Sequence, residues 1–318
     1  MRVLVTGAGG FIGRTLANTL RERGDEVIGL DLIAGPNIVA GNVAEAGPWQ
    51  DSFDSVDLVI HTAALVSNVP TLDEAWRVNV VGTRNVLDAA VRAGVQRFVH
   101  FSSIRAFSDL GFPDGVTEHH PVRPDGNPYV DTRVASEQVV LQAHSAGEIA
   151  ATIVRPGDVY GPGSRPWTVL PIQLIKQNLF VLPAMGNGIF SPIYIDDLVA
   201  GVLLAADSPA AIGQVFTISG GIGITTKEFF AHYYRMLHKR GPVVVPTSVA
   251  IALSTGSAQL SKFTSINAEL SPVSVKYLCR TGTYSIDKAR QMLGFEPKID
   301  LETGMALTRK WLASEGMI

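Results

Sequence analysis

The chain has 318 residues, of which 46% are hydrophobic and 17% are charged, and its formal net charge is −3. This length fits one large domain or two closely joined domains, and the hydrophobic content excludes an intrinsically disordered protein. Because the chain has no excess of basic residues to hold a phosphate backbone, nucleic acid is not an expected partner.

The sequence predicts a cytoplasmic protein that holds no metal. Cys279 is the single cysteine, which excludes an intrachain disulfide, and no Cys/His cluster has the spacing of zinc ligands. A strand and a turn start at the first residues, without a signal-peptide pattern. The longest apolar stretch, residues 243–253, contains Pro246 and is about half as long as a membrane span. We therefore expect a buried or surface-dipping helix there and no membrane span.

Short apolar runs alternate with helical patterns through the first half of the chain. Strands are expected at residues 3–6, 26–30, 58–61, 98–102 and 152–155. A helix that begins near Ile12 and ends at Gly24 follows the first strand, and a longer helix is expected over residues 75–93. Continuously apolar strands are typical of a sheet covered on both faces, so this pattern predicts an α/β fold with a Rossmann-type, doubly wound parallel sheet.

Proline and glycine become frequent after residue 163, and two apolar runs within residues 193–219 indicate a late return to the sheet. The second region is therefore interleaved with the first. We expect a larger Rossmann-type domain and a smaller second region, with these boundaries: residues 1–165 with return elements at about 192–220 for the first, and residues 166–191 and 221–318 for the second.

A glycine-rich turn follows the first strand. Gly7, Gly10 and Gly13 have the spacing GxxGxxG between a strand and a helix. Such a turn needs a positive φ, and close approach of a pyrophosphate leaves no room for a Cβ atom. The free N–H groups of the helix N-terminus then attract the phosphates. A tight turn without a ligand is the alternative, and the next acidic residue argues against it.

Asp31 closes the second expected strand, where a carboxylate can accept hydrogen bonds from the adenosine ribose hydroxyls. A carboxylate at this position repels a 2′-phosphate, and Leu32 and Ile33 supply no cation for one. The sequence therefore predicts NAD as the cofactor and disfavours NADP. A turn cap is the structural alternative for Asp31.

A second group of polar residues has the chemistry of proton transfer. Tyr129 and Arg133 stand four residues apart at the start of an expected helix, so they share a face, and Ser103 follows an expected strand. Hydride transfer at a carbinol carbon needs an acid/base at the oxygen, and a tyrosine can serve if a nearby cation stabilises its phenolate. These three residues can supply that set.

The chain resembles the extended short-chain dehydrogenase/reductase family from residue 3 to residue 311. Seven motifs carry the resemblance: TGAGGFIG at 6–13, VIHTAA at 59–64, VNVVGTRNVLDAA at 78–90, FSS at 101–103, PYVDTR at 128–133, RPGDVYGPG at 155–163 and IYIDDLVAG at 193–201. The tail, residues 283–312, is similar to the branch that contains the 3β-hydroxysteroid dehydrogenase/isomerases and related sterol or ketone reductases.

The resemblance implies roles for individual positions. Tyr129 matches the catalytic acid/base, Ser103 the hydroxyl that polarises the substrate oxygen, and Asn79 an asparagine of the active-site helix near the cofactor. The cofactor-binding residues that it implies are Gly7, Gly10, Phe11, Ile12, Gly13, Asp31, Asn42, Val43, Thr62, Ala63, Ala64, Asn79, Tyr129, Arg133, Pro156, Gly157 and Val159.

Two positions depart from the family pattern. Asn42 stands where the family usually has an aspartate that faces adenine, and an amide can still bind the exocyclic amine. Arg133 stands where the family has the lysine that binds the nicotinamide ribose and favours the ionised tyrosine. Arginine keeps the positive charge, but its planar fork is longer than a lysine side chain. A scaffold that binds the cofactor without catalysis is therefore an alternative.

Several other signals are interpreted as structural. The pair His119-His120 is expected to be solvated, and the pair Asp196-Asp197 is expected at a helix start. The predicted core aromatic residues are Phe229, Phe230, Tyr233 and Tyr234, on a helix that a capping box at Thr225 and Glu228 opens, and a last helix follows Asp300. The candidate substrate residues are Ser67, Arg165 and Trp167.

We therefore expect an NAD-dependent oxidoreductase that interconverts a secondary alcohol and a ketone on a mainly apolar, steroid-like or other hydrophobic small molecule. The larger domain is the expected NAD-binding domain, and the smaller region is the expected substrate-binding region. A nucleotide-sugar epimerase or dehydratase with retained NAD is the first alternative. A non-catalytic dinucleotide sensor is the second. The sequence leaves the substrate, the direction of reaction and the assembly open, and a homodimer is one of the assemblies it allows.

Overall fold

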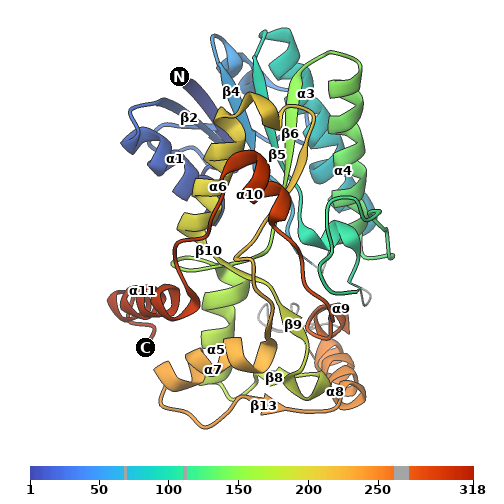
Figure 1. Ribbon diagram of the computed structural model, residues 1–318, viewed down its shortest axis with the longest axis vertical. Coiled ribbons are helices and arrows are strands. Elements are labelled where there is room, and N and C mark those ends of the chain that lie inside the picture. Colours follow the sequence, from blue (N-terminus) through green and yellow to red (C-terminus); the bar gives the residue numbers. More distant parts are fainter. Residues whose placement is uncertain (68–69, 110–112, 261–271) are drawn as a thin grey trace.

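A computed structural model describes residues 1–67, 70–109, 113–260 and 272–318. Figure 1 shows a central sheet flanked by helices, and a second layer of helices and short strands beyond the carboxyl ends of the sheet strands.

The central sheet has seven strands, all parallel, in the order β11-β6-β5-β4-β1-β2-β3. In chain order they are β1 (Arg2–Thr6), β2 (Glu26–Asp31), β3 (Ile38–Ala40), β4 (Leu58–His61), β5 (Arg97–Phe101), β6 (Ala150–Pro156) and β11 (Val215–Ile218). The strand order reverses between β1 and β4, which opens a crevice at their carboxyl ends, where α/β folds bind dinucleotides. The predicted doubly wound parallel sheet is confirmed.

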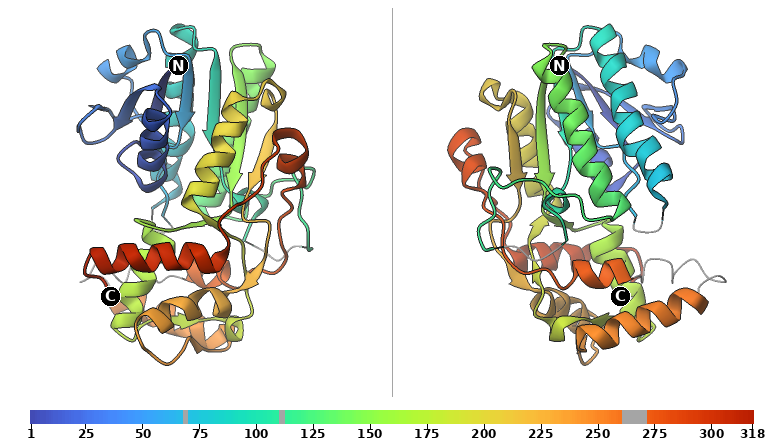
Figure 2. Two further views of the ribbon diagram at one scale, coloured as in Figure 1. Left: turned by 60° about the vertical axis from the view of Figure 1, so that its left-hand side comes forward. Right: turned by 90° about the vertical axis from the view of Figure 1, so that its right-hand side faces the viewer.

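Helices cover both faces of the sheet (Figure 2). One face carries α1 (Phe11–Glu22), α6 (Ile195–Asp207) and α10 (Asp287–Leu293), and the other carries α3 (Gly82–Arg92) and α4 (Pro128–Ser145). Each face has its own hydrophobic core. Because both faces are buried, strands such as β4 have no exposed side chains, which explains their continuously apolar sequences.

The second layer contains α5 (Leu170–Lys176), α7 (Thr226–Met236), α8 (Thr247–Leu260), α9 (Pro272–Tyr277) and α11 (Leu301–Ser314). Three two-stranded pairs accompany them: β7 (Asp158–Tyr160) with β10 (Pro192–Tyr194), β8 (Val181–Leu182) with β13 (Val243–Val244), and β9 (Ile189–Phe190) with β12 (Ile224–Thr225). The four aromatic residues of α7 are buried, as predicted, in a core that continues onto the α6 face of the sheet.

The expected helix over residues 75–93 is interrupted. It consists of α2 (Leu72–Trp76), a π-helical turn at Arg77–Val81 and α3, and the N–H of Gly82 donates to the carbonyl of Arg77. A π turn inserts one extra residue, which a sequence periodicity of 3.6 does not reveal, and such turns are frequent at functional sites. Asn79 lies in this turn.

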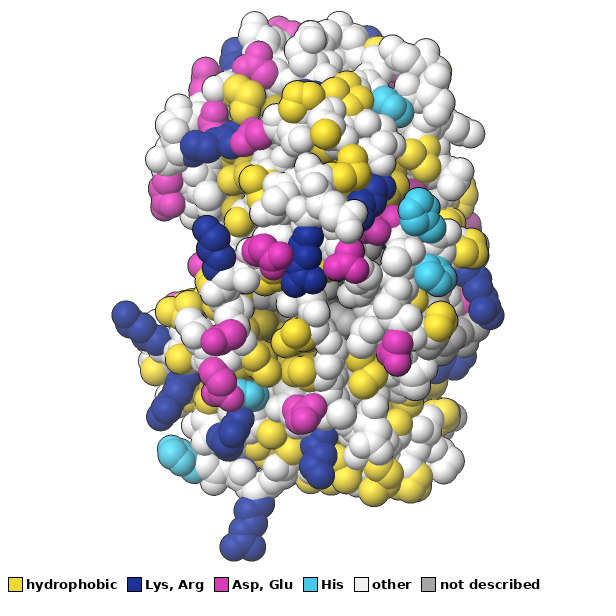
Figure 3. Space-filling view, in the orientation of Figure 1, with side chains coloured by type: hydrophobic (Ala, Val, Ile, Leu, Met, Phe, Trp, Pro, Cys, Tyr) yellow, Lys and Arg dark blue, Asp and Glu magenta, His cyan; other side chains and the backbone are white. Residues whose placement is uncertain are grey.

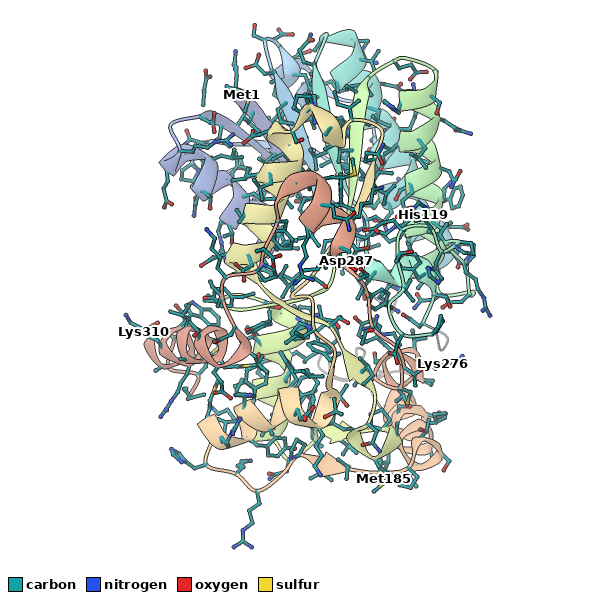
Figure 4. The ribbon with its side chains drawn as sticks, in the orientation of Figure 1. Met1, His119, Met185, Lys276, Asp287 and Lys310 are labelled. Carbon is teal, nitrogen blue, oxygen red and sulfur yellow. The ribbon has the colours of Figure 1, made fainter. Side chains whose placement is uncertain are left out.

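The apolar stretch at 243–253 forms β13 and the first half of α8. Ala250 is buried, whereas Val249 and Leu253 are 43% and 55% exposed. Apolar side chains gather at this end of the molecule in Figure 3, near Met185, which Figure 4 labels. Among the described residues, no helix is both long and apolar enough to cross a membrane.

Two buried histidines lie side by side on β4 and β5. The rings of His61 and His100 stack with centroids 5.5 Å apart, and His61 bonds the hydroxyls of Thr6 and Thr83. Burial, assisted by the positive charge of Arg133, lowers the pKa of His61 to about 3. Burial also holds the pKa of His100 well below its ordinary value. Both rings are therefore neutral at neutral pH.

This pair predicts a loss of stability in mild acid. Below about pH 6.5 the unfolded chain binds a proton that folded His61 rejects, so the free energy of unfolding falls by about 1.4 kcal/mol per pH unit for each such histidine. His61→Gln should reduce that slope by about 1.4 kcal/mol per pH unit between about pH 6 and pH 4.5 in urea titrations. His119→Gln, at an exposed site, is the control. Equal slopes for wild type and His61→Gln contradict the prediction.

Candidate functional site

The glycine turn leaves the N-terminus of α1 open to a ligand. Gly7 has φ +70°, and a Cβ atom there would lie 2.8 Å from Thr62 Oγ1. A Cβ atom on Gly13 would collide with the carbonyl oxygen of Gly7. The N-cap residue of α1 is Gly10, so no side chain caps the first N–H groups of the helix, including those of Phe11 and Ile12. This cradle fits a pyrophosphate.

Asp31 lies beside the cradle at the end of β2. Its Oδ2 accepts from the N–H of Gly9 at 2.8 Å, and its Oδ1 accepts from the N–H of Leu32 at 2.7 Å. These bonds fix the carboxylate, and each oxygen keeps a second lone pair for a ribose hydroxyl. The next two residues, Leu32 and Ile33, are 69% and 81% exposed and carry no positive charge that could bind a 2′-phosphate.

A cavity of about 510 Å³ lies next to Asn42. Asn42 Oδ1 accepts from the N–H of Ala44 at 3.1 Å, and the carbonyl of the buried Val43 accepts from Asn85. The lining residues come from the segments after β3 and β4 and from α2 and the π turn: Asn42, Ala44, Leu65, Ser67, Pro70, Glu74, Arg77 and Val78. Ser67, a substrate candidate from the sequence, thus lies with Asn42 on the adenine side of the predicted cofactor site.

Asn79 fixes the loop that follows β4. Its Oδ1 accepts from the N–H of Leu65 at 2.7 Å, and its Nδ2 donates to the carbonyl of Leu65 and to Thr132 Oγ1. Within the same loop, Thr62 Oγ1 donates to the carbonyl of Thr6 and the N–H of Ala63 donates to Thr6 Oγ1. These bonds show that the Asn79 amide positions residues 62–65. Its expected place in the active site, near the cofactor, stays a prediction.

Tyr129 and Arg133 come from the first two turns of α4, which Asn127 caps through the N–H of Tyr129. The guanidinium carbon of Arg133 lies 5.0 Å from the ring centroid of Tyr129, and its Nη1 donates to the carbonyl of Phe101 at 2.8 Å. The Tyr129 hydroxyl has no hydrogen-bond partner within the described part of the chain. The expected pairing of these two side chains is therefore present.

Arg133 is a buried cation that is incompletely paired. It is 4% exposed, its Nε has no partner among the residues described, and no carboxylate of those residues lies within 4.0 Å of it. An unpaired charge in the interior is costly, and arginine does not lose its proton. This buried donor fits a site that binds an acceptor from outside the chain, as the predicted nicotinamide ribose would be.

Ser103 sits at the carboxyl end of β5 and caps the 3-10 helix η3 (Ile104–Phe107). Its Oγ accepts from the N–H of Arg105 at 3.1 Å. The hydroxyl hydrogen has no acceptor in the described parts of the chain, and Ser103 is half-buried. Its O–H is therefore available to donate to a substrate oxygen.

The segment after β6 approaches the same place. The N–H of Gly157 donates to the carbonyl of Ile218, and a Cβ atom on Gly157 would lie 2.6 Å from the carbonyl oxygen of Ser191. Pro156 ends β6, and Val159 in β7 is 7% exposed. The tight approach at Gly157 keeps this segment against the carboxyl end of the sheet.

Comparisons with known proteins show the family of the chain. The NAD dependent epimerase/dehydratase family matches residues 3–219 of the chain. A 3 beta-hydroxysteroid dehydrogenase/Delta 5→4-isomerase of Mycobacterium tuberculosis is 31% identical over an alignment that covers 93% of this chain and 86% of that protein. The chain belongs to the NAD dependent epimerase/dehydratase family. The predicted NAD-dependent enzyme of the extended short-chain dehydrogenase/reductase type is confirmed at this level.

Members of this family differ in activity. The UDP-glucose 4-epimerase of Mycolicibacterium smegmatis is 28% identical and is aligned over 97% of both chains. The structure of MoeE5 in complex with UDP-glucose and NAD is 24% identical, with a TM-score of 0.81 and 99% of both chains covered. Family membership therefore gives the cofactor and leaves the substrate to the residues of this chain.

The two other substrate candidates, Arg165 and Trp167, lie on η4 (Arg165–Val169). Arg165 is exposed, whereas Trp167 stacks on Tyr277 with centroids 5.2 Å apart and packs edge-on against Phe190. Neither lines the cavity beside Asn42. The cavity beside Asn42 therefore includes Ser67 but not Arg165 or Trp167, and the substrate roles of all three residues stay predictions.

Sequence reasoning missed a buried charged cluster next to Trp167. Asp158 pairs with Arg280 at 3.1 Å and accepts from the hydroxyl of Tyr277. Burial raises the pKa of Tyr277 well above its ordinary value, so it stays protonated. Asp158 belongs to the RPGDVYGPG motif and could have been noticed, but Tyr277 and Arg280 reach it from α9 and from the residues after α9, and no local pattern indicates this.

Within the part of the chain that the structure describes, the histidine pair at 119–120 and the aspartate pair at 196–197 are not grouped into a metal site. His119 lies on the exposed loop before α4 (Figure 4), and among the described residues no group of three or more His, Cys, Asp or Glu could hold a metal. Asp196 and Asp197 lie in the first turn of α6, as expected, and Asp197 accepts from the N–H groups of Lys298 and Ile299.

Proposed function

We propose that this protein interconverts a secondary alcohol and a ketone on a mainly apolar small molecule. The observation that carries the proposal is a pair of hydroxyls, one from Ser103 at the carboxyl end of β5 and one from Tyr129 at the start of α4. Each has an O–H without an acceptor among the described residues. Both residues contact Arg105, and the ring of Tyr129 also lies beside the buried cation of Arg133. A carbinol or ketone oxygen needs two such hydroxyl groups, one to exchange its proton and one to hold it.

Each of these residues would bind one part of NAD or act on the substrate oxygen. The glycine turn would hold the pyrophosphate, Asp31 the adenosine ribose and Arg133 the nicotinamide ribose of NAD. When bound, NAD supplies the hydride acceptor for oxidation or, in its reduced form, the donor for reduction. Tyr129, as phenolate, removes the proton of the carbinol oxygen while the adjacent C–H bond breaks, and Ser103 donates a hydrogen bond to that oxygen throughout. In reduction the Tyr129 hydroxyl returns the proton.

Two features support the proposal that the substrate is apolar. The relative from Mycobacterium tuberculosis named above acts, by its name, on 3β-hydroxysteroids. The second layer, which we propose receives the substrate, exposes apolar side chains on α8 such as Val249 and Leu253, and places Trp167 and Tyr277 near Tyr129 through Arg105. A flat, apolar molecule fits aromatic surroundings of this kind.

A nucleotide-sugar epimerase is the second candidate, and the specific observation in its favour is the similarity over 97% of both chains to the epimerase of Mycolicibacterium smegmatis. The purified protein with NAD(H) should be tested on steroids, long-chain ketones and aryl ketones against UDP-sugars. Turnover of apolar alcohols or ketones supports the proposal, and turnover confined to the sugars rejects it. Binding of NAD without turnover of any of them supports the sensor alternative.

Cofactor choice gives a separate prediction. NAD(H) should bind more tightly than NADP(H), because the fixed carboxylate of Asp31 repels a 2′-phosphate. Asp31→Ala should weaken the binding of NAD(H) and narrow the difference in affinity between NAD(H) and NADP(H). Titration calorimetry with both cofactors measures this, and equal or tighter binding of NADP(H) by the wild-type protein contradicts it. Asp54→Ala, an exposed carboxylate outside the site, is the matched control.

A further inference from the structure

Tyr129 belongs to a buried series of alternating arginine and tyrosine side chains that runs from α4 to α9. Its members, in spatial order, are Arg133, Tyr129, Arg105, Tyr277 and Arg280. Successive distances from guanidinium carbon to ring centroid are 5.0, 5.1, 4.7 and 3.8 Å. All lie within the range of cation–π attraction. We call these five residues the arginine–tyrosine series; α9, which carries Tyr277, is marked by Lys276 in Figure 4.

Arg105 is the central member and has contacts that the others lack. Its main-chain N–H donates to Ser103 Oγ at 3.1 Å, and its guanidinium lies over both Tyr129 and Tyr277. One residue thus contacts the proposed acid/base, the proposed oxygen-holding hydroxyl and the aromatic ring that stacks on Trp167.

The guanidinium of Arg105 is itself held in place. Its Nε donates to Asp109 Oδ1 at 2.9 Å and its Nη2 donates to Oδ2 of the same carboxylate. Both side chains are largely buried, with 11% and 4% exposed. Burial alone would lower the pKa of Arg105, but the bonds to Asp109 raise it above its ordinary value, so the group stays charged. A bidentate pair fixes the guanidinium plane, which a lysine could not reproduce.

We propose that Arg105 is a positioning residue that sets Tyr129 and Ser103 relative to each other and to the substrate wall at Tyr277 and Trp167. The inference rests on the proposed function, because it assigns Arg105 to the proton transfer at Tyr129. Because Asp109 holds the Nε and Nη2 groups of Arg105, we assign Arg105 a role through Tyr129 and Ser103 and none in binding the substrate. It acts by placing the two hydroxyls and by adding positive charge next to the Tyr129 ring.

The test compares Arg105→Met, Arg105→Lys and the control Arg123→Met, which removes an exposed arginine from the neighbouring loop. The assay uses a substrate that the wild-type protein turns over. Arg105→Met should lower kcat about 10-fold or more, since a misplacement of about 1 Å can cost 100-fold. Its affinity for NAD should stay within about twofold of wild type. A variant that still binds NAD is folded, so the loss of kcat then reports position and charge.

The pH profile separates charge from position. Arg105→Met leaves the carboxylate of Asp109 without its partner near Tyr129, so in the oxidative direction the rise of kcat/KM should move to higher pH. Arg105→Lys keeps the charge and loses the fork, so its kcat should fall with little movement of the profile. If Arg105→Met fails to bind NAD, the test rests on Arg105→Lys: a fall in kcat supports the inference, and an unchanged kcat contradicts it.

Three outcomes are distinct. The inference is overturned if the Arg105 variants match Arg123→Met in kcat and pH profile while Tyr129→Phe is inactive. It is also overturned if Arg105→Met raises KM with kcat unchanged, because Arg105 would then bind substrate. If Tyr129→Phe retains full activity, the proposed function fails first.

Discussion

The variants Tyr129→Phe and Arg133→Met are each expected to lose at least about 100-fold in kcat/KM, the loss that follows when proton transfer is disabled. Tyr129→Phe removes the hydroxyl that exchanges the proton and keeps the ring. Arg133→Met removes the cation 5.0 Å from the ring and the donor proposed for the nicotinamide ribose, so NAD binding should weaken as well.

The conservative variant decides what Arg133 contributes. If its charge matters more than its shape, Arg133→Lys keeps measurable activity, and in the oxidative direction the pH profile of Arg133→Met moves to higher pH because phenolate is harder to form without the cation. Steady-state kinetics and NAD titration of the variants measure both effects. Wild-type turnover with an unmoved profile in Arg133→Met would show that Arg133 is not catalytic and would favour the scaffold or sensor alternative.

The largest effect on stability is expected at the ion pair that ties α4 to β6. Glu137 is 1% exposed at its side chain, accepts from Arg155 Nε at 2.8 Å and Nη2 at 2.6 Å, and accepts from Ser102 Oγ at 2.5 Å. Removing one partner leaves a buried charge uncompensated. Glu137→Gln should therefore lower the free energy of unfolding by about 3 kcal/mol or more.

Glu296→Gln is the matched control, because Glu296 pairs with Arg290 at 2.9 Å but is 61% exposed. An exposed pair of this kind is worth at most about 1 kcal/mol. The double variant Glu137→Gln/Arg155→Met should recover part of the loss, since no charge is then left alone. Urea unfolding measures all four proteins, and a loss at Glu137 no larger than that at Glu296 contradicts the prediction.

The sequence predicts the sheet well because its signals are local. The strands around Val5, Ile60 and Val99 are apolar runs of the right length, and the glycine turn reveals the first crossover. Boundaries differ by one or two residues, for example β5 at Arg97–Phe101 against the expected 98–102. The short strand β3 and the two-stranded pairs of the second layer were missed, since strands of two or three residues have no periodicity to detect.

In the candidate site too, residues in local motifs could be predicted, and residues brought together by tertiary packing could not. Asp31, Ser103 and Tyr129 stand in motifs, so their positions at the carboxyl ends of β2, β5 and at the start of α4 could be predicted. Arg105 and Tyr277 could not, because contacts between residues so far apart in the sequence depend on how α9 packs against η3. The sequence placed Asn79 near the cofactor, and it did not indicate that the π turn directs its amide to Leu65 and Thr132.

The most direct test of hydride transfer between a secondary alcohol and NAD uses a deuterium label. A secondary alcohol that the protein turns over is deuterated at its carbinol carbon and incubated with the protein and NAD. A dehydrogenase acting through Tyr129 should release one NADH carrying deuterium at the nicotinamide C4 for each ketone formed, and Tyr129→Phe should release almost none. Deuterium that stays in the organic product, with no net formation of NADH, would contradict the proposed reaction and point to an epimerase or dehydratase.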